Sequence, residues 1–449
     1  MAGIKIKPKK FKIQFIANTD TSIHAGLPVI EAMARRFGLW KKIDALRCLD
    51  PRKDCSRGYS PAVIVGQLIY ALCSGGGCLS DSEALNDDPL VRELFGVAKF
   101  ADQSQVGEWL RAQTEVGIAA LRSLLREFVA WIITRAKPGR LLLAGRTEVF
   151  FDDTQIEVSS DKFQGAKLNY NGDIALSWQC LWVGPLLADA DLGSAGEVSA
   201  ELPAMLSQSR ELWADKRAHF WADSGSSAGI YLNAINAQGF DYSVSYNKWT
   251  SPLERAAAGL PPSAWSAATD DGPRKHQSHA WVRHQPEGCE QAQLFAATRW
   301  KREGEMFERY GFIACDAAQQ DVKLLIERHR IKGEKERLFS EVLSGMDLHH
   351  PPCHSLAANR AYYLIAALAY NLVTAVKLLD LGDAQQSWQF KTMLKKLIFL
   401  PGRLSKKARQ WVAKIQVPGQ WLSWWERWQT QAWPESCRQT MSTMRAASG

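Results

Sequence analysis

The sequence has no pair of cysteines in a Cys-x-x-Cys spacing, although its 449 residues include nine cysteines. An odd number of cysteines without this spacing supports neither a disulfide framework nor a common zinc ribbon. A run of apolar residues long enough to cross a bilayer is also lacking. The most apolar stretch, residues 361–376, contains Tyr370 and Asn371 and is shorter than the roughly 20 residues that a membrane helix needs. We therefore expect a buried core helix there and no membrane partner.

No apolar segment follows the basic first residues, because residues 11–15 alternate between apolar and polar side chains, so a secretory signal is not expected. Internal repeats and low-complexity tracts are also absent from the sequence. Hydrophobic residues make up 46% and charged residues 23% of the chain, which is ordinary for a soluble globular protein. These features predict a folded cytoplasmic protein in which the thiols stay reduced.

The net charge of +8 is unevenly distributed. Residues 1–13 contain five lysines and no acidic residue, and residues 391–414 contain eight basic residues and again no acidic one. Basic segments of this kind are typical of surfaces that bind a polyanion such as DNA, although solvated surface lysines are the alternative. Within the second segment we predict DNA contacts from Lys395, Lys396, Lys406 and Lys407.

The N-terminal third of the chain has a helical pattern. Apolar residues recur at spacings of three and four in residues 27–46, 61–73 and 106–131, which predicts an all-helical N-terminal domain over residues 1–140. The glycines at 75–77 and the Asp-Pro segment at 87–89 supply breaks between helices.

After residue 140 the hydrophobic period changes to that of strands. Candidate strands cover residues 149–151, 174–183 and 220–222, with a helical pattern at 201–213 before the last of them. This alternation predicts an α/β domain over residues 141–382 with some parallel pairing. Short strand-like runs predict a β-rich insertion in it at about residues 250–320.

Residues 383–449 form the third predicted region, a basic, Trp-rich helical tail. The dipeptides Pro401-Gly402 and Pro418-Gly419 bracket short amphipathic pieces within it. The complete expected architecture is therefore an α/β core with a β-rich insertion, preceded by helices and followed by a helical basic tail.

Two aspartates stand at the ends of predicted strands, Asp152 after residues 149–151 and Asp223 after residues 220–222. The carboxyl ends of such strands open onto a crevice where functional groups gather, although a turn or capping aspartate is the alternative. Glu336 lies three residues before Phe339 on a helical pattern and so borders its apolar face. A solvated, charge-rich helix is the alternative for this glutamate.

The order of these segments resembles the DDE transposases of bacterial insertion sequences. The resemblance rests on Asp-x-Thr at 152–154, Ala-Asp-Ser-Gly at 222–225 and the helical segment at 329–336. Two further segments, Ala-Asn-Arg at 358–360 and Leu-Ala-Tyr-Asn-Leu at 368–372, are similar to one subgroup of the family, as is the tail at 401–411. The likeness covers about residues 15–415.

The resemblance implies an RNase H-like core on which Asp152, Asp223 and Glu336 hold two divalent ions. Hard oxygen ligands without soft ones suit Mg²⁺ or Mn²⁺, and two such ions support phosphodiester cleavage and strand joining. Separations of 71 and 113 residues leave room for the insertion in the second gap. Asp153 competes with Asp152 for the first position, because adjacent strand residues face opposite sides of a sheet and only one of them is expected at the ions.

The family's Tyr-x-x-Arg-x-x-x-Glu pattern matches His329, Lys332 and Glu336 here, while Leu343 stands where the family has a lysine. The match implies that His329 and Lys332 contact phosphate near the cut. Trp249, beside Lys248, is a candidate for stacking on a flipped base, although a tryptophan in the core is the alternative. A zinc site at His349, His350, Cys353 and His354 has a spacing that fits no common zinc module.

The predicted function is therefore DNA transposition. The enzyme would cut the ends of its element and join the 3′-hydroxyl to target DNA, acting on double-stranded DNA as a homodimer. The N-terminal helices would recognise the terminal inverted repeats. Two alternatives stay open: a catalytically inactive DNA-binding regulator of the same fold, and an RNase H-like nuclease.

Overall fold

A computed structural model gives the fold of the chain. It describes residues 20–143, 145–214, 217–247, 251–269, 276–301, 304–316, 321–330, 333, 336–407 and 410–433. For Glu336 only the backbone is described. Lys332 and Trp249, both predicted site residues, lie outside the described residues.

The first part of the chain is mostly helical, and proline at the first turn starts three of its helices. Asp88 caps one of these, because its carboxylate accepts hydrogen bonds from the backbone N–H groups of Leu90 and Val91. The helices are α1 (Pro28–Phe37), α2 (Leu39–Ala45), α3 (Pro61–Cys73), α4 (Pro89–Phe95), α5 (Gln103–Arg111) and α6 (Glu115–Ile133).

A large mixed sheet follows, with ten strands among the described residues. Its central part runs in the order β6-β5-β3-β7-β8, in which β3 pairs parallel with β7 and β7 pairs parallel with β8, while β5 is antiparallel to both β3 and β6. These strands are β3 (Arg146–Glu157), β5 (Ile174–Val183), β6 (Leu186–Ser194), β7 (Ala218–Ala222) and β8 (Asp241–Tyr246). The short strands β2 (Leu142–Leu143) and β4 (Lys167–Leu168) pair with β3 and β5.

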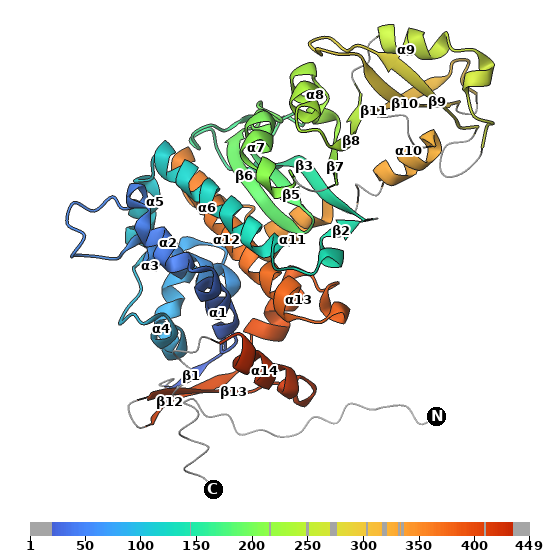
Figure 1. Cartoon of the computed structure of the whole chain (residues 1–449). Helices are drawn as coiled ribbons and strands as arrows, with labels where there is room; N and C mark the ends of the chain where they lie inside the picture. The colour runs from blue at the N-terminus through green and yellow to red at the C-terminus, as the bar shows by residue number, and fades with distance from the viewer. Residues whose placement is uncertain are drawn as a thin grey trace, which may run out of the picture.

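The expected β-rich insertion is present, and it extends the central sheet. Strand β11 (Arg309–Cys315) pairs antiparallel with β8, and β10 (Gln293–Trp300) and β9 (Ser278–His284) follow it outward. Figure 1 shows these strands at one end of the molecule, with α9 (Ser251–Ala258) beside them. The insertion is thus hydrogen-bonded to the core through β8.

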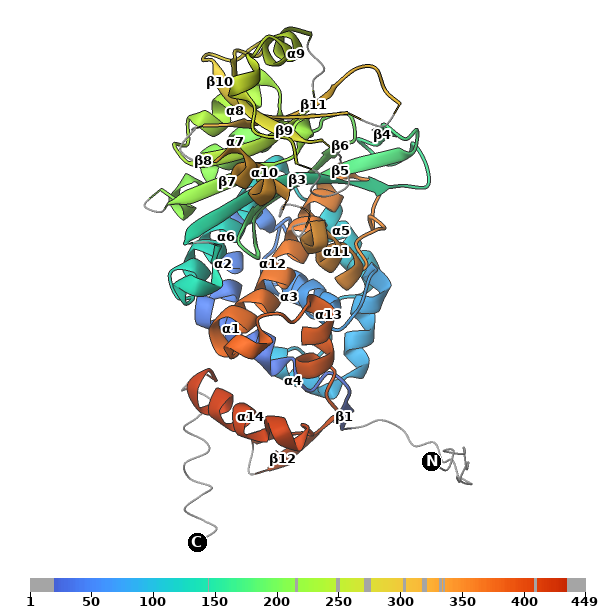
Figure 2. The ribbon, with the colours of Figure 1, turned by 90° about the vertical axis from the view of Figure 1, so that its right-hand side faces the viewer.

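Helices lie on both sides of the central sheet. Helices α7 (Leu202–Gln208) and α8 (Gly229–Asn236) connect β6, β7 and β8. After the insertion, α10 (Val322–Arg330), α11 (Glu336–Gly345) and α12 (Leu356–Asp380) follow. Figure 2 shows the large sheet as a layer above α11, α12 and the N-terminal helices.

Helix α12 is the expected core helix. It is long and apolar enough to cross a membrane, but 89% of its most apolar window is buried inside the protein. The helix contacts α1, α3, α5 and α6 as well as β6. Residues on both sides of the expected boundary near 140 therefore share one hydrophobic core.

The prediction of a wholly helical tail was wrong. Helix α13 (Phe390–Met393), a π-helical turn (Leu394–Ile398) and α14 (Gly419–Gln431) are helical, but β12 (Gly402–Lys407) and β13 (Gln410–Ile415) form an antiparallel hairpin. The physical reason is the period of two across β12, where Gly402 and Leu404 are buried and Arg403 between them is exposed.

The N-terminal region is also not wholly helical, because β1 (Thr21–Ser22) pairs with β12. The backbone N–H groups of Ala25 and Gly26 donate to the carbonyls of Leu400 and Ile398. A Cβ atom on Gly402 would come within 2.4 Å of the Ala25 Cβ, so this close approach requires glycine. The two ends of the described chain therefore meet in a three-stranded sheet.

Candidate active site

Asp152 and Asp223 lie next to each other where the parallel pairing of β3 with β7 ends, Asp152 within β3 and Asp223 directly after β7. The last register pair of β3 and β7 joins Phe151 to Ala222, and the two aspartates are the next residues on their strands. Neighbouring strands lie about 4.8 Å apart, so the backbones of these aspartates are close although 71 residues separate them in sequence. Asp223 directly follows its strand, as expected, whereas Asp152 does not end one, because β3 continues to Glu157 in its pairing with β5.

The two aspartates also share one face of the sheet. Register pairs place Asp152 opposite Cys180 on β5, and alternation puts Cys180 on the same face as Trp178 and Trp182. On β7, Trp221 pairs with Phe150 and so belongs to this face. Asp223 follows Trp221 by two residues with an extended backbone, φ −86° and ψ −171°, and therefore points to the same side.

Helix α11 covers this same face. The ring of Phe339 packs edge-to-face against Trp178 and Trp182, with centroid distances of 6.3 and 5.7 Å. Glu336, at the first residue of α11, precedes Phe339 by three residues, and residues three apart lie on one side of a helix. The helix that carries the third predicted carboxylate thus lies on the face of Asp152 and Asp223.

Asp153 faces the other side of the sheet, as alternation predicts. Its carboxylate accepts hydrogen bonds from the Ser177 hydroxyl and the Gln155 amide, both at 2.9 Å. Burial raises the pKa of Asp153, and the Asp223 carboxylate raises it further, while the Ser177 hydroxyl lowers it. Asp153 is therefore on the opposite face but within electrostatic reach of Asp223.

These carboxylates fit hard divalent cations. They are oxygen donors, which Mg²⁺ and Mn²⁺ prefer, and the charge of Asp223 adds to burial, the larger cause, in raising the pKa of the neighbouring Asp153. Among the described residues, no three acidic, histidine or cysteine side chains form a group that could hold a metal ion. Since the Glu336 side chain is not among them, the predicted triad stays a prediction.

The alternative zinc site has no support. His349, His350 and His354 are exposed while Cys353 is buried, and the ring of His354 packs against Phe163 at 4.7 Å. No metal-binding group includes these four residues, all of which the structure describes.

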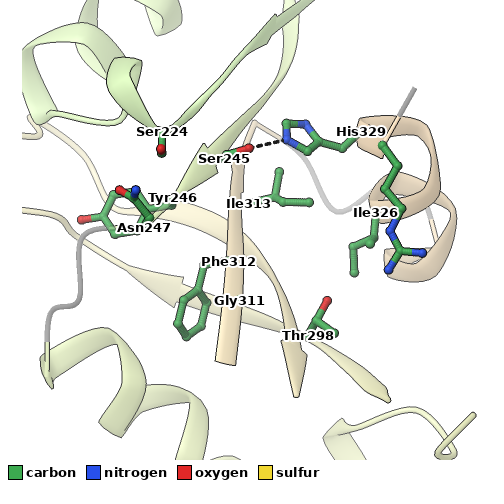
Figure 3. A pocket seen from close by; sticks show the side chains of 11 residues that line it. Ser224, Ser245, Tyr246, Asn247, Thr298, Gly311, Phe312, Ile313, Ile326 and His329 are labelled. Atoms are coloured by element: carbon green, nitrogen blue, oxygen red, sulfur yellow. Dashed lines mark hydrogen bonds between the residues drawn. The ribbon is translucent and has the colours of Figure 1, made fainter. Parts of the chain in front are cut away.

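His329 is buried, although it was expected to contact phosphate. Its ring lies on α10 with 7% of its surface exposed. The ring Nδ1 is 3.0 Å from the Ser243 hydroxyl and Nε2 is 2.7 Å from the Ser245 hydroxyl. Figure 3 shows the His329 ring pointing at Ser245 on β8. This location favours a role in holding α10 to the sheet.

Sequence analysis missed the two serines. In the sequence, Phe240, Tyr242, Val244 and Tyr246 alternate with polar residues, a pattern typical of a half-buried strand, but the polar Ser243 is fully buried as well. The reason is that α10 covers this face, and His329 supplies the hydrogen bonds that buried hydroxyls need. The signal in the sequence was a pair of alternating serines, which need a polar partner when they are buried. That partner can be identified only once the position of α10 is known.

A cavity of about 440 Å³ adjoins Asp223. Its walls come from Ser224 in the short 3-10 helix η5 (Ser224–Ser226) after Asp223, from β8, β10 and β11, and from α10. Figure 3 shows Ser224 on one side of it and His329 and Ile326 on the other. Asn247, two residues before Trp249, also lines it. The cavity combines hydroxyl and amide groups with the aromatic side chains of Tyr246 and Phe312.

The four predicted lysines are exposed on two elements. Lys395 and Lys396 lie on the π-helical turn, and Lys406 and Lys407 lie at the end of β12. The Lys406 ammonium is 5.1 Å from the centre of the Trp411 ring, an exposed aromatic on β13. Basic and aromatic groups thus stand together on the surface of the hairpin.

The segments after Glu336 that carried the resemblance have structural partners. The Asn371 side chain accepts a hydrogen bond from the Leu187 N–H and donates one to the Leu187 carbonyl, at 3.0 and 2.8 Å. Asn359 bonds both backbone groups of Cys353, and Arg360 forms an ion pair with Asp191 on β6. These residues fasten α12 to the sheet and to its own N-terminal loop.

Comparison with known families identifies the chain. A family model described as transposase DDE domain, group 1, matches residues 5–421. The match spans nearly the whole chain, and the protein belongs to the DDE transposases. It is a nucleic-acid-cutting enzyme whose substrate is DNA. No curated protein matches the sequence.

Proposed function

We propose that this transposase cuts DNA at the ends of its element and joins the freed 3′-hydroxyl to target DNA, with Asp152, Asp223 and Glu336 as its catalytic carboxylates. The observation that carries the proposal is the placement of Asp152 and Asp223 side by side on the sheet face that α11 covers. In this arrangement the chain returns to the sheet through α10 before it reaches Glu336, 113 positions after Asp223.

The strand order supports an RNase H-like core for this proposal. Three antiparallel strands, β6, β5 and β3, are followed by two strands, β7 and β8, parallel to β3. The insertion enters after β8 and returns the chain to α10. In chain order β3 is the first long strand of this core and β7 the fourth. Asp152 therefore lies on the first strand, and Asp223 follows the fourth.

The three carboxylates would hold two Mg²⁺ or Mn²⁺ ions, which supply charge stabilisation and activation of the attacking oxygen in phosphoryl transfer. Asp152 is the proposed ligand over Asp153, because it shares its face with α11. The hydrogen bond from the Gly225 N–H to the Asp223 carboxylate, at 2.8 Å, orients that side chain. Lys332 would contact a phosphate near the cut, as an ammonium group suits a phosphate oxygen.

The cavity beside Asp223 would receive an unpaired base near the cleaved end, with Trp249 as the stacking partner. Its volume and its aromatic and amide lining support this role. Phosphates farther along the DNA would meet Lys395, Lys396, Lys406 and Lys407, because exposed lysines beside an aromatic suit a nucleic-acid surface. The N-terminal helices would recognise terminal inverted repeats, and two copies of the chain would act together in the cytoplasm.

The test is cleavage and strand transfer with DNA that carries the element's own ends. Asp223→Asn removes one charge without changing the shape of the side chain, so cleavage should fall at least about 1,000-fold while end binding stays within about twofold. Asp161→Asn, at an exposed aspartate outside the site, is the control and should cleave at the wild-type rate.

Cleavage by the Asp223→Asn variant at the wild-type rate would show that Asp223 is not an active-site residue. End binding without cleavage by the wild-type protein in Mg²⁺ or Mn²⁺ would favour the inactive regulator. Cleavage without strand transfer, and without preference for the element's ends, would favour the nuclease.

A further inference from the structure

A buried histidine near the end of α10 joins the segment that leads to Glu336 to β8, in addition to the apolar contacts that Leu325 and Ile326 make with the strands of the insertion. Helix α10 ends at Arg330, six residues before Glu336. One residue earlier, the His329 ring reaches β8 and is hydrogen-bonded to Ser243 and Ser245, alternate residues on the same face of that strand. The ring also packs against Trp221, with a centroid distance of 6.0 Å. A single side chain therefore touches both parallel strands next to the site.

Trp221 connects this histidine to the second carboxylate. It is the penultimate residue of β7 and stands two residues before Asp223. Its ring lies between two imidazoles, that of His219 at 4.2 Å and that of His329 at 6.0 Å. His219 in turn reaches the Ser243 hydroxyl at 3.1 Å. The histidines, the serines and the tryptophan form one packed array under the end of β7.

A neutral His329 can form all of the hydrogen bonds of this array at once. The Ser245 hydroxyl donates to Nε2, Nδ1–H donates to the Ser243 oxygen, and the Ser243 hydroxyl donates to Nε2 of His219. Both serine hydroxyls and the Nδ1–H of His329 then donate one hydrogen bond each, and both ring nitrogens of His329 have a partner. A satisfied buried network of this kind fixes its members in one arrangement.

We propose that His329 is a positioning residue, which fixes the start of the Glu336 segment against β8 and Trp221 without contacting DNA. The inference rests on the proposed roles of Asp223 and Glu336. It assigns the histidine a different task from the phosphate contact implied by the family pattern. The ring acts through its hydrogen bonds to Ser243 and Ser245 and through its packing against Trp221, so the loss of the Ser245 hydroxyl should have the same consequence as the loss of the ring.

The experiment compares His329→Ala, Ser245→Ala and the double variant in cleavage and end-binding assays. Each single variant should lower the cleavage rate about 10- to 100-fold at fixed Mg²⁺. The double variant should be no slower than the slower single variant, because both changes remove the same hydrogen bond. End affinity should stay within about twofold, and the slope of log affinity against log salt should not change.

A second measurement separates positioning from a general loss of structure. If the Glu336 segment is misplaced, the Mn²⁺ concentration for half-maximal cleavage should rise about tenfold in Ser245→Ala while the melting temperature stays near the wild-type value. Direct Mn²⁺ binding, followed by electron paramagnetic resonance without DNA, should weaken to a similar extent. His329→Gln keeps a polar group near the position of Nε2. Its Mn²⁺ requirement for cleavage and its Mn²⁺ affinity should therefore be closer to the wild-type values than those of His329→Ala.

Two controls match the substitutions. His349→Ala removes an exposed histidine and Ser207→Ala removes an exposed serine hydroxyl, and both should behave as the wild type. A phosphate contact would give the opposite pattern: His329→Ala would weaken end binding and flatten the salt slope by about 0.9, with Ser245→Ala unchanged. Wild-type cleavage and Mn²⁺ dependence in Ser245→Ala would also overturn the proposal.

The failure of this inference is distinguishable from the failure of the proposed function. Asp223→Asn tests the carboxylates without touching the array. If Asp223→Asn abolishes cleavage and the Ser245→Ala variant is unaffected, the carboxylate site stands and only the positioning role falls.

Discussion

The Phe339 ring on α11 packs edge-to-face against Trp182 on β5, with the ring centroids 5.7 Å apart. This contact joins the helix that begins at Glu336 to the strand that pairs with Asp152. Since Trp182 and Asp152 belong to the same face of the sheet, the contact fixes which of the two adjacent aspartates shares a side with α11.

The first prediction distinguishes Asp152 from Asp153. Asp152→Asn should reduce cleavage at least about 1,000-fold, because it removes a carboxylate from the face of α11. Asp153→Asn should cost less than about tenfold, since the amide can still accept from the Ser177 hydroxyl. Single-turnover cleavage of end DNA measures both rates. The reverse order of the two losses would make Asp153 the ligand.

The second prediction concerns the salt dependence of DNA binding. Replacing Lys395, Lys396, Lys406 and Lys407 with Ala should flatten the slope of log affinity against log salt by up to about four units, at roughly 0.9 for each phosphate contact. Fluorescence anisotropy over a range of KCl concentrations gives the slope. The control is Lys162→Ala with Lys167→Ala, exposed lysines outside the segments proposed to bind DNA, which should leave the slope unchanged. An unchanged slope in the fourfold variant would show that these lysines are only solvated.

The third prediction concerns the buried ion pairs between α6 and β6. Arg122 is paired with Asp189, Asp191 and Glu201, and the Asp189 side chain is fully buried. Arg122→Ala should lower the free energy of unfolding by about 3–5 kcal/mol, because it leaves buried carboxylates with less compensation. Arg57→Ala, whose ion pair with Asp54 is exposed, should cost less than about 1 kcal/mol. Urea denaturation measures both; equal losses would contradict the prediction.

The fourth prediction concerns pH. Burial lowers the pKa of His219 from 6.5 to about 3, so the unfolded chain binds more protons than the folded one between these values. Stability contributed by the neutral ring is therefore present above pH 6.5 and is lost progressively as the pH falls. At pH 5 the loss from this residue should be about 2 kcal/mol.

The measurement is the free energy of unfolding of the wild type and of His219→Gln at pH 7 and pH 5. The variant cannot titrate at this position, so its stability should fall less between the two pH values. An equal fall in both proteins would show that other groups account for the acid sensitivity.

The sequence predicted the elements that have a strong period and missed those defined by distant partners. Residues 361–376 were correctly expected to be a buried helix, because their apolar run is unbroken by glycine or proline. Asp223 was correctly expected to follow a strand, but β3 continues past Asp152 to Glu157. The hairpin at 402–415 was missed, since its first strand, β12, pairs with residues 21–22, about 380 positions earlier.

Side-chain partners were harder to foresee than elements. The pattern around His329 and Glu336 suggested one functional stripe on one helix, yet His329 ends α10 and Glu336 begins α11. Nothing local shows that the histidine would bury itself against two serines of a strand some 84 residues away. Such pairings depend on how the sheet and helices pack, which periodicity alone does not contain.

The central position of α12 has a consequence for how the chain folds during synthesis. Helices α1, α3, α5 and α6 leave the ribosome first, but the helix against which they pack begins only at Leu356. Strand β1 can pair only after the chain has been synthesised beyond Gly402, which is later still. Because contacts between distant segments slow folding, the helical region should remain a loosely packed intermediate until most of the chain is complete. A ribosome that stops between the insertion and α12 would therefore release a protein that exposes its apolar helices and invites proteolysis.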